Sequence, residues 1–513
     1  MCVLDERGDN MLTRIMTASL NGVEGYPVTV EVDIHRGMPY FSIVGLAGTT
    51  IREACSRVRP AIINSGFAYP NERITVNLAP AGRHKEGSQF DLPVAMGIVI
   101  NSQGAACPPD TAFLGELSLD GNIRRIKGAL PLAMCLRNSG VKNIVVPAGN
   151  ADEVAILTDI NIFPAGNLND AVEHAMGIRC LPIYNVNKIY KTSRWDVDFS
   201  QVIGQEAAKR AIMTGAAGNH GVLLIGGPGC GKTMLAKRIP TILPELSYEE
   251  MLEITAVYSV AGLIGENDPV ISRRPFRAPH HTISVSGLIG GGGRPKPGEL
   301  SLAHRGVLFL DELGEFDPRT IDALRQPVET GCVRISRNFE EIIFPAEVML
   351  VAAANPCKCG YLWDERRICR CSSRELDSYR RKLAGPFSDR IDMHVRMSPV
   401  PGEMLDRSGN HHSGMCSEEM RNAITEARRI QAQRYAGSRY KDNGSLDSQG
   451  VEMFCRLDDE CRKTMAAAYD RFSLTMRSYV KVVKTARTIA DLDKSEKIKI
   501  EHVAEALAYR ITE

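Results

Sequence analysis

The sequence has no uninterrupted apolar run long enough to span a bilayer, so we expect no transmembrane segment. Its first residues, Met1–Asn10, are polar and lack the apolar core of a signal peptide, which predicts a cytoplasmic protein. An excess of charge is also missing, because 62 Lys and Arg face 61 Asp and Glu, a net charge of +1. Bulk electrostatics therefore favours neither nucleic acid nor membrane, and any contact with DNA must come from local patches.

The chain is long, and its cysteines are unevenly distributed. Its 513 residues are too many for one hydrophobic core, so we expect several domains. A composition of 44% hydrophobic and 24% charged residues is typical of soluble globular proteins. Most of the 14 cysteines occur singly, which favours free thiols in a reducing compartment.

The N-terminal third alternates between strand and helix patterns. Pro27–Ile34, Tyr40–Val44 and Arg73–Ala79 alternate apolar and polar residues, as half-buried strands do. Asp120-Gly121 suits the turn of a hairpin. The stretches that suit helices are Ile51–Ile63, Leu92–Ile100 and Ala129–Leu136. We therefore predict an α/β domain.

The middle of the chain has three short apolar runs, Val222–Ile225, Val307–Leu310 and Val348–Ala353. Helical stretches separate them, which indicates a parallel sheet covered on both faces. Ser417 can cap a helix whose first turn carries two glutamates. One helical stripe near the C-terminus comprises Ile500, Val503, Ala504, Leu507, Ala508 and Ile511. The last hundred or so residues are therefore expected to form a helical domain.

A phosphate-binding loop follows the first of these runs. The segment matches G-x-x-x-x-G-K-[ST] in full, with a strand before it and a helix after it. Glycines allow backbone N–H groups to converge on phosphate oxygens. Lys232 is expected to reach the β- and γ-phosphates of ATP, and Thr233 to ligate Mg²⁺. The residues expected around the nucleotide are Gly226, Gly227, Pro228, Gly229, Cys230, Gly231, Lys232, Thr233 and Met234.

Acidic and amide side chains follow the other two runs. Asp311 and Glu312 come directly after Val307–Leu310, and Asn355 follows the third run. Ligands bind at the carboxyl ends of strands in such sheets. Asp311 therefore suits Mg²⁺, Glu312 suits the general base that orients water, and Asn355 is a candidate for positioning that water.

These motifs resemble those of a known family. The phosphate loop, Asn355 and Gly385–Met393 (GPFSDRIDM) look like an AAA+ module of the magnesium-chelatase type. Arg274–Ser284 (RPFRAPHHTIS) and Pro297–Glu312 (PGELSLAHRGVLFLDE) narrow the resemblance to the ComM/YifB family of bacterial competence-associated ATPases. The resemblance extends from Met11 to the C-terminus.

The resemblance implies further roles. Arg390 matches the arginine finger that acts on ATP bound by a neighbouring subunit, and Arg477 matches the lid arginine that senses the γ-phosphate. An arginine acting in trans implies a homo-oligomeric ring, a hexamer. The implied function is an ATP-dependent motor on single-stranded or branched DNA, a helicase or translocase in recombination and natural transformation. A chelatase-like or protein-remodelling ATPase remains the alternative, although a chelatase motor lacks the fused N-terminal domain and the cysteine loop.

The resemblance also divides this α/β multidomain chain. We expect a disordered extension over 1–10, a Lon-protease-like domain over 11–184 and a linker over 185–200. An AAA+ core with a P-loop parallel sheet then covers 201–400, followed by a loop over 401–416 and a helical lid of the magnesium-chelatase C-terminal type over 417–513.

Lys85–Pro93 (KEGSQFDLP) and Gly115–Gly121 (GELSLDG) resemble the proteolytic domain of Lon-type proteases, but the residues for protease chemistry are missing. Lon-type proteases need a serine nucleophile and a lysine base. Gln89 falls at the nucleophile position and Leu130 at the base position, and neither can do this chemistry. Ser88 and Lys85 lie nearby in sequence, so an unusual dyad stays open beside the scaffold interpretation.

Four cysteines form two close pairs in the loop 357–371. Cys357, Cys359, Cys369 and Cys371 can provide four thiolates for a closed tetrahedral Zn²⁺ site of structural type. The alternative is a reduced loop without metal. Cations and aromatics that suit single-stranded nucleic acid are interleaved with them, and a solvated loop with an aromatic anchor is the alternative. These residues are Lys358, Arg366, Arg367, Arg370, Tyr361 and Trp363.

Two further features lead to expectations. Cys230 lies where the family has Ser or Thr, and a thiol at a helix N-terminus can have a lowered pKa, so we expect oxidation-sensitive ATPase activity. A second basic patch precedes Asp311, and its histidine pair lacks an acid at metal-ligand spacing, Glu266 being the nearest. The patch comprises Arg273, Arg274, Arg277, His280 and His281.

Overall fold

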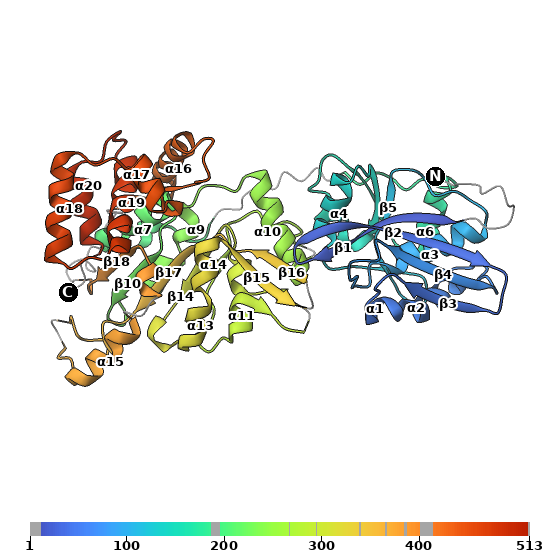
Figure 1. Ribbon diagram of the computed structural model, residues 1–513, viewed down its shortest axis with the longest axis horizontal. Coiled ribbons are helices and arrows are strands. Elements are labelled where there is room, and N and C mark those ends of the chain that lie inside the picture. The colour runs from blue at the N-terminus through green and yellow to red at the C-terminus, as the bar shows by residue number, and fades with distance from the viewer. Residues whose placement is uncertain are drawn as a thin grey trace.

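The computed structural model describes residues 12–185, 195–265, 267–293, 295–337, 340–364, 367–383, 387–400 and 414–510. Figure 1 shows an elongated molecule in which an α/β domain, an α/β core and a helical region follow one another along the long axis. The predicted extension over 1–10, Glu266, Arg366 and most of the predicted loop over 401–416 lie outside the described residues. Within the described ranges, no helix combines the length and the apolar character needed to cross a membrane.

The N-terminal domain is built on a seven-stranded mixed sheet in the order β3-β4-β2-β1-β5-β8-β9. These strands are β1 (Thr13–Asn21), β2 (Glu24–His35), β3 (Tyr40–Val44), β4 (Arg73–Ala79), β5 (Thr111–Phe113), β8 (Asn143–Pro147) and β9 (Asn161–Ala165). The predicted alternation is confirmed in β4, where every second residue is buried. A hairpin of β6 (Glu116–Leu117) and β7 (Ile123–Arg124) surrounds the predicted turn.

Helices pack on this sheet because their apolar residues need a partner surface. They are α1 (Thr49–Arg52), α2 (Ala54–Asn64), α3 (Asp91–Ser102), α4 (Ala129–Asn138), α5 (Ala151–Val154) and α6 (Leu168–Ala175). The helix α3 is buried from Asp91 to Ile100 and packs against β1 and β2. The single predicted helix over 51–63 is divided into α1 and α2.

The core contains a five-stranded sheet in which every pairing is parallel, in the order β11-β14-β17-β10-β18. Its strands are β10 (Val222–Gly226), β11 (Phe276–Arg277), β14 (Val307–Leu310), β17 (Met349–Ala354) and β18 (Met393–Met397). The strands β10, β14 and β17 are buried along their whole length, which explains their uninterrupted apolar sequences. Because the strands are parallel, the carboxyl ends of all three meet at one edge of the sheet.

Helices and two hairpins surround this sheet. The helices are α7 (Glu206–Gly218), α8 (Lys232–Ala236), α9 (Ile239–Ile242), α10 (Tyr248–Ala261), α11 (Val285–Ile289), α12 (Glu299–Leu302), α13 (Pro318–Ala323), α14 (Arg325–Thr330) and α15 (Ser373–Leu383). The hairpins pair β12 (Gly290–Gly291) with β13 (Lys296–Pro297) and β15 (Cys332–Arg337) with β16 (Glu340–Pro345). Figure 1 shows α15 extending from the core, away from the N-terminal domain.

The C-terminal region is helical, as predicted. Its helices are α16 (Ser417–Arg434), α17 (Ser448–Phe454), α18 (Asp459–Arg471), α19 (Met476–Leu492) and α20 (Ile500–Ala508). Two details of the prediction are wrong. Cys416 caps α16, while the Ser417 hydroxyl accepts a hydrogen bond from the Phe199 backbone. The buried face of α20 includes His502, Val503, Ala506 and Leu507, because this face packs against α18 and α19.

Candidate nucleotide site and metal centre

The phosphate loop connects β10 to α8. Gly229 and Gly231 have φ values of +80° and +89°, a region that glycine enters without strain, and open space surrounds both. The Lys232 Nζ donates hydrogen bonds to the carbonyls of Gly226 (2.6 Å) and Gly227 (3.0 Å) and to Asn355 Oδ1 (3.1 Å). Burial lowers the pKa of Lys232. The structure therefore brings Asn355 to the phosphate loop.

A hydroxyl and a carboxylate meet beside this lysine. The Thr233 hydroxyl donates to Asp311 Oδ2 at 2.7 Å, from the first turn of α8 to the end of β14. Hard oxygen ligands of this kind suit Mg²⁺, which is held in proteins by one or two side chains together with substrate phosphates. The donor set of Thr233 and Asp311 therefore fits the predicted ion.

Glu312 projects from the same strand end in a left-handed backbone conformation, with φ of +52°. Its Oε2 lies 3.4 Å from His281 Nδ1. The His281 ring is 4.1 Å from that of His280 and meets Phe316 edge-on at 6.4 Å. Sequence reasoning missed this contact, although His281 follows β11, the strand next to β14, and that adjacency was the available signal.

The predicted second basic patch is not an open cationic surface. Arg274 is buried and pairs with Glu250 at 2.9 Å, and Arg277 pairs with Glu299 at 2.6 Å. Arg273 lies over the Trp195 ring at 4.9 Å. Arg274 and Arg277 therefore pair with carboxylates of α10 and α12 within the core, and contact of this patch with DNA stays a prediction.

Arg390 and Arg477 line one cavity of about 660 Å³ that also contains Lys481 and Lys484. No residue of the phosphate loop lines this cavity. The Arg390 Nε lies 2.8 Å from Glu329 Oε1. Both predicted arginines therefore face a cavity that the phosphate loop of the same chain does not line.

The lid helix α19 holds the segment that carries Arg390. The Lys481 Nζ donates to the carbonyls of Asp389 (2.6 Å) and Ile391 (3.2 Å), which flank this arginine. Lys481 and Lys484 also lie 3.3 and 3.2 Å from the buried Asp392 carboxylate. A buried charge cluster thus fixes the lid to the core beside Arg390.

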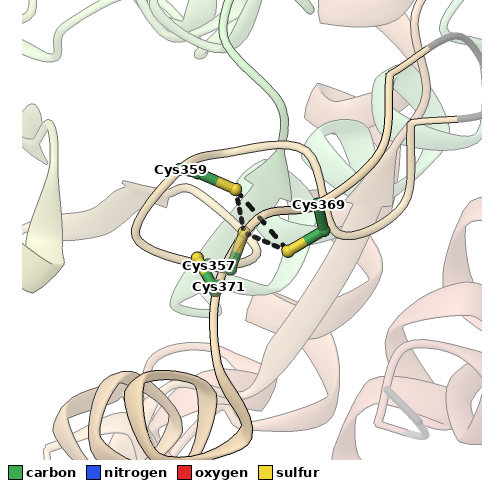
Figure 2. A group of neighbouring side chains, drawn as sticks. All are labelled: Cys357, Cys359, Cys369 and Cys371. Atoms are coloured by element: carbon green, nitrogen blue, oxygen red, sulfur yellow. Dashed lines mark hydrogen bonds between the residues drawn. The ribbon is translucent and has the colours of Figure 1, made fainter.

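The four clustered cysteines face one another (Figure 2). Their sulfur atoms all lie within 4.8 Å of each other, and Cys357 is buried. A capping box begins α15, because Ser372 and Glu375 exchange hydrogen bonds there. The chemistry of four thiols in contact fits a soft or borderline metal such as Zn²⁺.

The aromatic residues of this loop are engaged by the protein itself. Trp363 packs on the core with Arg396 over its ring at 4.6 Å. The Tyr361 hydroxyl accepts a hydrogen bond from Arg367 at 2.8 Å. The structure therefore favours the aromatic-anchor interpretation for Trp363 over base stacking.

Cys230 differs from its prediction. The side chain is 4% exposed, and burial raises the pKa of this thiol even though Lys232 acts in the opposite direction. The expected lowered pKa is wrong because a helix N-terminus activates only a thiol that solvent reaches.

Lys85, the lysine of the possible dyad, has a structural role in the N-terminal domain. Lys85 is fully buried, and its Nζ donates to the carbonyls of Gly45 and Pro80 rather than to Ser88. Burial lowers the pKa of Lys85. Leu130 is fully buried, and the Gln89 amide donates to the Glu86 carbonyl. The geometry thus favours a scaffold over an unusual dyad.

A parallel sheet with a phosphate loop and acids at its carboxyl edge, followed by a helical lid, defines an AAA+ fold of the magnesium-chelatase type. Three family models match the chain: "Magnesium chelatase, subunit ChlI" over 198–405, "Subunit ChlI of Mg-chelatase" over 30–150 and "Magnesium chelatase, subunit ChlI C-terminal" over 414–510. The chain belongs to the ComM/YifB family of magnesium-chelatase-like proteins.

Relatives of two kinds are similar to the chain. The competence protein ComM of Haemophilus influenzae is 40% identical over 95% of both chains, and the uncharacterized protein YifB of Escherichia coli is 40% identical over 97% of both. The 38 kDa magnesium-chelatase subunit of Rhodobacter capsulatus is 27% identical over 31% of this chain and 50% of its own length. The ComM and YifB proteins therefore match almost the whole chain, whereas the magnesium-chelatase subunit matches about a third of it.

Proposed function

We propose that the protein is an ATP-hydrolysing ring motor that acts on DNA, by branch migration or translocation in recombination and natural transformation. The observation that supports this proposal is that the phosphate loop and Arg390 lie at opposite ends of the parallel strands. Gly226 ends β10 at the carboxyl edge, and Arg390 precedes β18 at the amino edge.

The strand register gives the scale of this separation. Val222 pairs with Met393 and Gly226 pairs with Met397, so four residues of strand lie between the two edges. At about 3.3 Å per residue this is about 13 Å, before the residues that lead to Arg390 are added. An arginine finger works in contact with the γ-phosphate. Arg390 therefore suits the nucleotide of a neighbouring subunit, which a head-to-tail ring provides.

In the proposed site Lys232 binds the β- and γ-phosphates of ATP, while Thr233 and Asp311 hold Mg²⁺. The ion would neutralise charge on the phosphates. Glu312 orients and deprotonates the attacking water, and Asn355, which accepts a hydrogen bond from Lys232, helps to position that water. Arg390 and Arg477 of the next subunit stabilise the charge that develops in the transition state.

DNA is the proposed substrate because exposed cations project from the core. The helix α15 has no buried residue and follows the cysteine loop. This basic projection comprises Lys358, Arg370, Arg374, Arg380 and Arg381, all of them exposed. Cations on a projecting element suit the phosphate backbone. The relative that matches 95% of the chain is named a competence protein, which agrees with a role in the uptake of DNA.

A chelatase-like or protein-remodelling ATPase is the competing function, supported by the likeness to the magnesium-chelatase subunit. The test is the ATPase rate of the purified protein with no addition, single-stranded DNA, branched DNA or an unfolded protein. We expect DNA to stimulate turnover, with a stimulation that falls as salt rises. Stimulation by protein and not by DNA would reject the DNA motor.

Two variants test the chemistry. Lys232→Ala should abolish ATP binding, because the loop loses its cation. Glu312→Gln should bind ATP and hydrolyse it about 100-fold or more slowly, because an amide cannot act as a base. A Glu312→Gln protein with normal turnover would show that Glu312 is not the general base. The proposed ATP-binding site would be unaffected by that result.

A further inference from the structure

The cysteine loop lies directly on the phosphate loop. Gly360, which directly follows Cys359, has φ of +85°, and a Cβ there would lie 2.7 Å from Pro228 Cδ. A Cβ on Gly227 would lie 3.2 Å from the Gly360 carbonyl oxygen. The two backbones therefore approach as closely as glycine allows. The Gly360 N–H donates to the Cys357 carbonyl at 3.0 Å, so the same turn that presents Cys357 and Cys359 touches the phosphate loop.

Three of the four sulfurs are separated as in a tetrahedral metal site, and the Cys371 sulfur lies within 4.8 Å of each of them. The Cys357 Sγ lies 3.4 Å from that of Cys359 and 3.8 Å from that of Cys369, and Cys359 and Cys369 are 3.5 Å apart. A zinc ion bound at about 2.3 Å places the sulfurs about 3.8 Å apart. A disulfide would instead require a sulfur separation of about 2.0 Å.

A second connection joins this loop to the nucleotide site. Cys357 follows Asn355 by two residues, and Asn355 Oδ1 accepts the hydrogen bond from Lys232. The segment between them therefore runs from the phosphate-binding lysine into the cysteine cluster. On the far side, Trp363 is fixed by Arg396, which lies on β18 beside β10. The cysteine loop thus runs from the end of β17 to a contact on β18, next to the strand that leads into the phosphate loop.

We propose that Zn²⁺ bound by the four cysteines is a component of the nucleotide site: it sets the turn at Gly360, and this turn supports the phosphate loop in its binding conformation. The inference rests on the proposed binding of ATP at this loop. A loop that holds its binding conformation for only one tenth of the time binds its ligand about ten-fold more weakly. Removal of zinc should therefore raise the Kd for ATP about ten-fold while the remainder of the core stays folded.

The experiment uses the full-length protein. Zinc per chain is measured by atomic absorption, and the Kd for methylanthraniloyl-ATP is measured before zinc release by a mercurial, after it, and after zinc is restored. Circular dichroism confirms that the stripped protein is folded. We expect one zinc per chain, a Kd about ten-fold higher without it, and recovery on its return.

A glycine substitution separates the contact from the metal. Gly360→Ala should retain zinc and still weaken nucleotide binding, because its Cβ meets Pro228. Gly437→Ala is the matched control, since Gly437 has a similar φ of +76° and open space around it. Its Kd should equal that of the wild type.

The outcomes distinguish a failure of the zinc proposal from a failure of the proposed ATP binding. Protein without zinc, or a folded stripped protein with an unchanged Kd, would overturn the inference and leave the proposed ATPase intact. Gly360→Ala with wild-type affinity would overturn it as well. Zinc-loaded protein that binds no ATP would instead refute the proposed function.

Discussion

Replacement of Asp392 by asparagine removes the central charge of the junction between the lid and the core. The carboxylate is 8% exposed and lies 3.3 Å from Lys481, 3.2 Å from Lys484 and 3.3 Å from His220 Nδ1. Burial alone would raise the pKa of Asp392, but the charges of Lys484 and Lys481 outweigh it and hold the pKa well below its ordinary value. The wild-type side chain is therefore ionised and compensated.

The cost in stability follows from the charges that stay buried after Asp392→Asn. Two lysines that are 7% and 8% exposed lose their shared anion. Removal of one partner of a buried ion pair costs about 3–5 kcal/mol, because the other charge stays buried without compensation. The control is Asp493→Asn, which breaks a 3.0 Å pair with Arg210 where the carboxylate is 43% exposed. Such a pair is worth about 0–1 kcal/mol.

Hydrogen exchange of the backbone amides in α19 measures this loss as local opening. We expect Asp392→Asn to speed their exchange by about 100- to 5,000-fold, and Asp493→Asn by less than about ten-fold. Turnover of ATP should also fall in Asp392→Asn, because Lys481 fixes the carbonyls on both sides of Arg390. Equal exchange in the two variants would refute the view that Asp392 compensates the lysines.

The pH dependence of this difference has a defined sign. A carboxyl whose folded-state pKa is depressed adds stability that is present above its unfolded pKa, about 3.9, and that is lost as pH falls through the folded pKa. The stability difference between the wild type and Asp392→Asn should therefore have its full value above about pH 5. It should shrink as the solution becomes more acidic. A gap that grows on acidification would contradict the ionised assignment.

Three further predictions concern the nucleotide site. Lys232→Ala and Arg390→Ala proteins should each be inactive alone and regain ATPase activity when mixed. In a randomly mixed ring, about one quarter of the interfaces combine an intact phosphate loop from one subunit with an intact Arg390 from the next. No recovery would place both residues in one subunit's site. His281→Ala should lower turnover about ten-fold with little change in KM, because the carboxylate it contacts loses its position; steady-state kinetics at saturating ATP decides this. Cys230 should react with iodoacetamide long after the exposed Cys180, because it is buried with a raised pKa, and peptide mass spectrometry gives the order.

The sequence was sufficient to predict the residues at the carboxyl edge of the core sheet. Lys232, Thr233, Asp311 and Asn355 each follow an apolar run or a glycine-rich turn, and parallel strands bring such positions together. The cysteine cluster was predictable for a similar reason, because close spacing limits how far its members can separate. Local pattern and one topological rule were enough in both cases.

Pairings across distant segments could not be predicted in the same way. His281 follows β11, a two-residue strand too short to give a pattern, so its approach to Glu312 depends on a pairing that only the folded sheet defines. Arg274 has the composition of a surface cation and is buried because Glu250, on α10, lies opposite it. Burial of Cys230 likewise depends on its neighbours in the core.

The contacts between the N-terminal domain and the core bear on how that domain would move in the proposed ring. Tyr248, on α10, donates to the Ile156 carbonyl at 3.0 Å, and the Ser259 hydroxyl binds the buried Glu153 carboxylate. Leu252 joins the same hydrophobic cluster as the apolar residues of α4, while Asn21 donates to the Glu341 carbonyl on β16 at 3.3 Å. These contacts, at two separate places, oppose both a hinge motion and a twisting motion between the N-terminal domain and the core. Either motion would expose apolar surface or leave the buried Glu153 carboxylate without its partner. The N-terminal domain is therefore expected to move together with its own core, so that changes between neighbouring subunits of the proposed ring would displace it as well.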